Sequence, residues 1–136
     1  MYRIVLAIDT DVDRSISQAQ AIIDLAASPD TIAVTIAHGF EFKGPDDELV
    51  ALESVQEVTT RFDEHEIPYE LRDKQAEPAS FVIEIADEID ADAICVGGTT
   101  QSPVGKVLFG SVAQQIILEA DRSVLIAGGY TGERGD

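Results

Sequence analysis

The chain has 136 residues, 45% of them hydrophobic, which is the size and composition of one compact domain. Asp and Glu total 26 against 9 Lys and Arg, so the formal net charge is −17. Such a charge repels nucleic-acid phosphates and anionic lipids, and we expect neither as a partner.

Three further features of the composition bear on where the protein works. The longest apolar runs, such as 4–8, are too short to span a bilayer, and the N-terminus leaves no room for a leader, which predicts a cytoplasmic protein. The acids are spread along the chain, which favours a halophilic cytoplasm over an acidic mesophilic one because molar salt screens their repulsion. Cys95 lies in an apolar run, and we interpret it as a buried core residue.

Strand-like and helix-like segments alternate along the chain. Buried strands are predicted at 3–8, 31–37, 91–96 and 123–127, with an alternating edge strand around 67–71. Four helices are predicted between these strands. The first is capped by Asp13, and the second carries an apolar stripe from Leu49 to Phe62. The third begins at Pro78, and the fourth begins at Ser111. The order βαβαβαβαβ predicts an α/β fold with a five-stranded parallel sheet and helices on both faces.

Two of the predicted strand ends carry unusual residues. Asp9 ends the first strand, and Gly97-Gly98 ends the fourth and begins a loop rich in Gly, Ser and Thr. Ligands of open parallel sheets bind beyond the carboxyl ends of the strands, where the strand order reverses. If these two strands are neighbours, both loops line one crevice, and the helix that begins at Ser111 directs its positive end at it.

The loop from Gly97 to Ser111 reads GGTTQSPVGKVLFGS. Gly105-Lys106 is not a Walker motif, because Thr100 stands where the first glycine is needed and Val107 stands where Ser or Thr is needed. Lys106 is either solvated or placed to neutralise a phosphate. No G-x-G-x-x-G follows the first strand, which argues against a dinucleotide-binding fold.

The spacing in this loop resembles that of the universal stress protein family. Nucleotide-binding members carry Gly, two residues, Gly, nine residues, and then Gly-Ser or Gly-Thr. Here Gly97 matches the first glycine, Thr100 occupies the second, and Gly110-Ser111 completes the pattern. The resemblance extends over the chain, since the strand that ends at Asp9 and the Ala76-Glu77-Pro78 helix start also resemble the family's.

The resemblance implies a sheet order of 3-2-1-4-5 in a Rossmann-like fold of the adenine nucleotide alpha hydrolase type. It implies one domain over 1–129, followed by a polar tail at 130–136. It implies a homodimer through the fifth strand at Val124, Leu125 and Ile126. It also implies an ATP site, with Mg or Mn held at Asp9. The cofactor-binding residues so predicted are Ala7, Asp9, Gly39, Gly97, Thr100, Gly105, Gly110, Ser111 and Val112.

Two departures from the family pattern keep an alternative open. Thr100 replaces a glycine with a stiff β-branched residue, and Gly39 follows His38 where ATP-binding relatives place an apolar residue against adenine. The alternative is a member that binds no nucleotide and acts as a dimeric interaction protein. Ser111 and Gln114 also form the pattern of a capping box, which would explain the serine without a ligand.

An enzyme is a third hypothesis. The sequence shows no evident nucleophile–base pair, and its two histidines, His38 and His65, offer few candidates for a catalytic base. We interpret His38 as a strand-end residue. Slow ATP hydrolysis with a metal at Asp9 stays open.

Overall fold

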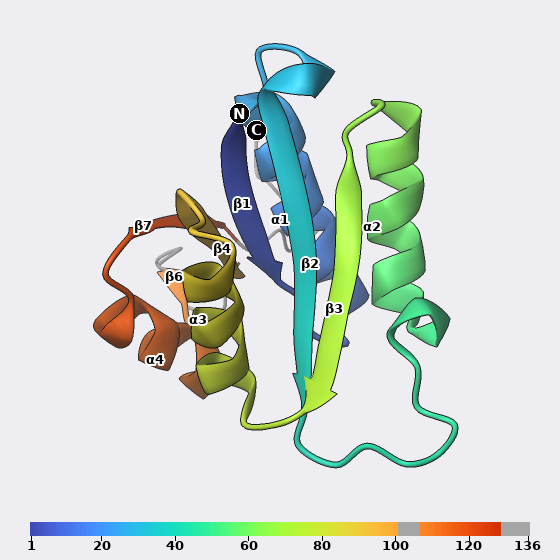
Figure 1. Cartoon of the computed structure of the whole chain (residues 1–136), viewed down its shortest axis with the longest axis vertical. Helices are drawn as coiled ribbons and strands as arrows, with labels where there is room; N and C mark the ends of the chain where they lie inside the picture. Colours follow the sequence, from blue (N-terminus) through green and yellow to red (C-terminus); the bar gives the residue numbers. More distant parts are fainter. Residues whose placement is uncertain (101–106, 129–136) are drawn as a thin grey trace.

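A computed structural model describes residues 1–100 and 107–128 of the chain (Figure 1). Within these residues a five-stranded sheet has the order β3-β2-β1-β4-β7, and all neighbouring strands are parallel. The strands are β1 (Tyr2–Ala7), β2 (Ile32–Phe40), β3 (Tyr69–Gln75), β4 (Ala93–Gly97) and β7 (Ser123–Ala127). This is the predicted order 3-2-1-4-5, which the structure confirms.

Helices cover both faces of the sheet, as the alternating pattern predicts. They are α1 (Val12–Leu25), α2 (Glu53–Glu64), α3 (Pro78–Glu88) and α4 (Ser111–Glu119). α1 and α2 pack together on one face, and α3 and α4 on the other. Two short 3₁₀ turns, η1 (Pro29–Thr31) and η2 (Leu49–Ala51), precede β2 and α2.

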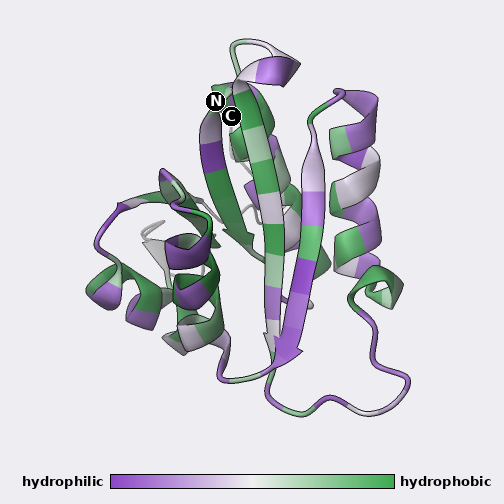
Figure 2. Cartoon of the chain, in the orientation of Figure 1, coloured by the Kyte–Doolittle hydropathy of each residue, from purple (hydrophilic) through white to green (hydrophobic). Residues whose placement is uncertain are grey.

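The central strand β1 is apolar on both faces because each face meets a separate core. Ile4 and Leu6 belong to the core under α1 and α2, whereas Val5 belongs to the core under α3 and α4. The edge strand β3 is instead mostly hydrophilic (Figure 2). Its charged side chains discourage pairing with another chain, which is how proteins protect sheet edges.

Several element boundaries differ from the prediction. The first helix is capped by Asp11, whose carboxylate accepts from the Arg14 N–H at 2.8 Å, and Asp13 lies inside its first turn. β2 extends to Phe40, because β3 pairs with it as far as Gln75. The predicted helix from Leu49 is interrupted at Leu52, whose backbone is extended, and α2 proper begins at Glu53.

The fourth strand and the loop after it also differ. β4 begins at Ala93 because Asp90, with φ of 53°, ends the preceding helix in a left-handed turn. After β4, the strands β5 (Thr99–Thr100) and β6 (Val107–Leu108) form a short antiparallel pair where we predicted mostly loop. The predicted tail at 130–136 lies outside the described residues. No helix in the described ranges has the length and apolar character to cross a membrane.

Candidate functional site

A cavity of about 380 Å³ lies at the carboxyl ends of β1 and β4. These are the neighbouring strands between which the strand order reverses. The cavity brings together seven of the nine predicted site residues: Ala7, Asp9, Gly39, Gly97, Gly110, Ser111 and Val112. Thr100 lies in the short strand β5, and Gly105 falls outside the described residues.

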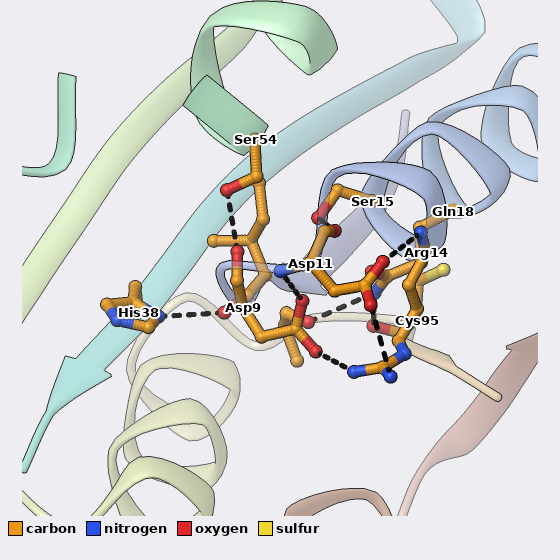
Figure 3. Close-up of polar contacts among 10 residues, drawn as sticks. Asp9, Asp11, Arg14, Ser15, Gln18, His38, Ser54 and Cys95 are labelled. Carbon is orange, nitrogen blue, oxygen red and sulfur yellow. Dashed lines mark hydrogen bonds and ion pairs between the residues drawn. The ribbon is translucent and has the colours of Figure 1, made fainter. Parts of the chain in front are cut away.

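Both oxygens of the Asp9 carboxylate have partners in the five residues that follow it (Figure 3). Oδ1 accepts from the backbone N–H of Asp11 at 2.9 Å. Oδ2 lies 2.5 Å from Nη1 of Arg14, a residue in the first turn of α1. The sequence analysis did not single out Arg14. The signal available for it was its position five residues after the strand-ending aspartate, within reach of that carboxylate.

The backbone around Asp9 is held from two neighbouring segments. His38 donates from Nδ1 to the carbonyl oxygen of Ile8 at 2.8 Å, and the Ser54 hydroxyl donates to the carbonyl oxygen of Asp9 at 2.6 Å (Figure 3). Because a carbonyl oxygen only accepts, Nδ1 of His38 carries the proton. His38 therefore orders the segment after β1, although it lies inside β2, which continues to Phe40, and not at the end of its strand as we interpreted it.

A buried glutamine joins the two strands that diverge at this point. Gln18 of α1 is fully buried, and its Nε2 donates to the carbonyl oxygens of Ala7 at 3.0 Å and Cys95 at 3.2 Å. A single amide thus ties the end of β1 to β4. The sequence signal for it was a glutamine one turn before Ile22, on the buried stripe of the helix.

Cys95 is a buried and unreactive thiol, as predicted. Burial raises the pKa of Cys95 to about 12, so the thiolate form is absent at neutral pH.

The apolar wall of the cavity comes from α3, α4 and the sheet. Its members are Ala7, Val96, Pro78, Val82, Val112 and Ile116. Gly39 is required by packing: a Cβ there would lie 2.9 Å from the Cα of Pro78 and 3.2 Å from the Ala76 carbonyl oxygen. An apolar side chain after His38 would therefore displace the start of α3. Pro78 and Val82 supply apolar surface beside that position instead.

The N-terminus of α4 forms the opposite rim. Gly110 is the residue that precedes the helix and Ser111 is its first residue, and both are exposed at the cavity. The predicted capping box is wrong, because Gly110 occupies the cap position and the Gln114 amide donates to the carbonyl oxygen of Phe109 at 3.0 Å. Backbone N–H groups in a first helical turn lack partners within the helix, which gives this rim a partial positive charge.

Comparison with protein-family models matches residues 1–128 to the universal stress protein family. The chain belongs to this family. A universal stress protein of Mycolicibacterium smegmatis is 35% identical over 72 residues, which are 52% of this chain and 55% of that protein. The chain spans about half the length of the curated relatives it matches.

Solved structures of family members show the same fold. The universal stress protein from Archaeoglobus fulgidus superimposes with a TM-score of 0.75 at 27% identity, over 93% of this chain and 98% of that one. The universal stress protein from the same organism in complex with dAMP gives a TM-score of 0.67 at 25% identity, over 93% and 97%. The predicted family and its Rossmann-like fold are therefore confirmed.

Proposed function

We propose that this member of the universal stress protein family is a stress-response module that binds an adenine nucleotide, ATP, in the cavity between β1, β4, α3 and α4. The observation that carries the proposal is the meeting of an apolar wall and a helix N-terminus in one cavity at the strand-order reversal. Its volume of about 380 Å³ lies within the range of small-molecule sites.

The two sides of the cavity suit the two parts of a nucleotide. Pro78, Val82 and Val112 offer apolar surface for a base. Gly110 and Ser111 begin a helix whose N–H groups can donate to phosphate oxygens. The family structure described as a dAMP complex shares this fold and supports an adenine nucleotide as the ligand.

Equilibrium calorimetry of ATP binding to the native protein tests the proposal. The titration is run in molar KCl, which screens the net charge of −17. We expect saturable binding of ATP. We expect weaker binding of GTP, because guanine would place a more polar base edge against the apolar wall. Mass spectrometry of small molecules released from the purified protein gives an independent reading. The absence of saturable ATP binding would contradict the proposal.

A homodimer through β7 is the second part of the proposal. β7 lies at the edge of the sheet, with Ile126 44% exposed, and Leu118 of the preceding helix is 83% exposed. An apolar edge strand favours association because it presents both unpaired backbone groups and apolar side chains. This contrasts with the charged edge β3.

Light scattering after size exclusion tests the dimer with two lysine substitutions. Ile126→Lys is expected to give a monomer, whereas Val50→Lys, at an exposed apolar residue of η2, is expected to leave the dimer intact. A monomeric parent protein would contradict this part. A dimer that binds no nucleotide would instead favour the alternative, a dimeric interaction protein. Both hypotheses place the protein in the cytoplasm.

A further inference from the structure

The Arg14 guanidinium contacts the Asp9 carboxylate, the group at which the family resemblance implies a divalent cation. Its Nη1 lies 2.5 Å from Oδ2 of Asp9, and its Nη2 lies 3.6 Å from Oδ2 of Asp11. The other oxygen of Asp9 accepts a backbone hydrogen bond. A metal at this carboxylate would have to displace a guanidinium group, so the residues present do not fit the metal that the family resemblance implies.

The stem of Arg14 packs against Gly97, the first glycine of the loop motif. A Cβ on Gly97 would overlap Cγ of Arg14 and would lie 2.7 Å from its Cδ. The arginine stem thus fills the space beside β4 that a side chain at 97 would occupy. Its guanidinium group points toward the carboxylates of Asp9 and Asp11 (Figure 3), and the residue lines the cavity.

The charge of the cavity lining depends on the same residue. Among the described residues that line the cavity, Arg14 is the only Lys or Arg, and Asp9 and Glu41 are the acids. The described part of the chain also holds no cluster of three or more His, Cys, Asp or Glu side chains that could bind a metal ion. The Arg14 side chain is 30% exposed, so a ligand in the cavity can reach it.

We propose that the Arg14 guanidinium takes the place of the divalent cation, so that the site holds the nucleotide phosphates without metal. This inference rests on the proposed nucleotide function. A guanidinium group presents several donors in a fixed plane, of which one can stay on Asp9 while others donate to a phosphate. Asp9 then orients the arginine, and Arg14 contacts the ligand.

Calorimetry of ATP binding in EDTA and in MgCl₂, at matched ionic strength in molar KCl, tests this inference. The parent dissociation constant is expected to agree within about twofold between the two conditions. Arg14→Gln is expected to weaken binding in EDTA by about tenfold or more, as the loss of a charged hydrogen bond predicts. In this variant MgCl₂ is expected to restore part of the affinity, because Asp9 is released to bind the ion.

Arg61→Gln is the matched control, because it also removes one positive charge but lies on α2 beside Glu57. Its affinity for ATP is expected to stay within about twofold of the parent. Thermal unfolding checks that both variants fold, and the comparison of EDTA with MgCl₂ in the parent needs no variant.

The possible failures point to different errors. A parent that binds ATP about tenfold more tightly with MgCl₂ would overturn this inference and leave the proposed function standing. Equal ATP affinities of Arg14→Gln and Arg61→Gln in EDTA would also overturn this inference and leave the proposed function standing. The absence of ATP binding in every condition would overturn both.

Discussion

The two faces of the sheet are built from similar residues but end differently at the carboxyl edge. Under α1 and α2 the core is filled to that edge, where the buried Ser54 hydroxyl is bonded to the Asp9 carbonyl oxygen and the buried Gln18 amide is bonded to the strand ends. Under α3 and α4 the core gives way to the cavity, which Ile116 lines although it is itself fully buried.

The difference separates a face that is closed by packing from a face that holds a cavity. On the closed face, the buried amide satisfies carbonyl groups where the strands diverge. On the open face, the space between β1, β4 and the start of α4 forms the cavity in which we propose that a nucleotide binds. The substitutions below test this contrast, from the largest expected effect to the smallest.

Matched isoleucine truncations test it most directly. Ile22→Ala and Ile116→Ala remove the same atoms from fully buried sites on opposite faces. Ile22→Ala is expected to lower the free energy of unfolding near the upper end of about 2–5 kcal/mol, because it leaves a closed cavity. Ile116→Ala is expected near the lower end, because the new space joins a cavity that opens to solvent. Chemical denaturation measures both, and equal losses would mean that the two faces are equally closed.

The buried amide of the closed face is the second test. Gln18→Leu leaves the carbonyl oxygens of Ala7 and Cys95 without this donor, and we expect a loss of about 1–3 kcal/mol in the free energy of unfolding. Gln20→Leu is the control, because Gln20 is exposed on the same helix and bonds only to Asp24 among the described residues. Its change is expected to stay within about 0.5 kcal/mol. A similar loss in the two variants would show that Gln18 has no special role.

Filling the open face is the third test. Val112→Phe places a larger ring in the cavity, so the affinity for ATP is expected to fall about tenfold or more while the free energy of unfolding changes by less than about 1.5 kcal/mol. Leu25→Phe, at an exposed position at the end of α1, is the control and should leave the affinity unchanged. Unaltered ATP affinity in Val112→Phe would place the ligand elsewhere.

Alkaline pH provides the smallest test, again on the closed face. Burial raises the folded-state pKa of Cys95 from 9.0 to about 12, so folding favours the neutral thiol. This contribution to stability is complete below pH 9 and is lost as the pH rises from 9 toward 12. Between pH 9 and 10 the loss is on the order of 1 kcal/mol. Cys95→Val lacks the titrating group, and its free energy of unfolding should fall less over that interval. If the free energy of unfolding fell equally with pH in the parent and in Cys95→Val, the thiol would be accessible to water in the folded protein.

Much of the fold could be predicted because it depends on local patterns. The continuous apolar run of β1 and the alternation predicted over 67–71 reflect one strand buried on both faces and one at the edge, although β3 itself runs from Tyr69 to Gln75. The boundaries were less accurate, because they depend on partners. β2 continues through Phe40 only because β3 pairs with it there.

The candidate site also contains residues that the sequence could predict and residues that it could not. Asp9, Gly97 and Ser111 could be found from their spacing and from their places at strand and helix ends, and the structure gathers them around one cavity. Arg14 and Gln18 were missed because helical spacing shows which face a polar residue occupies but not which group it contacts. Their partners are an aspartate five residues earlier and a strand 77 residues away.

For the loop that begins at Gly97, the sequence determined its length, its place after a buried strand and its Gly-Ser exit into a helix, because these are local and ordered along the chain. Only the tertiary structure shows why glycine is needed at Gly97, in this loop, and at Gly39, in β2. Gly97 accommodates the stem of Arg14, and Gly39 accommodates the start of α3. Such close approaches arise only when segments distant in sequence pack together, so the spacing of the glycines could mark them but not explain them.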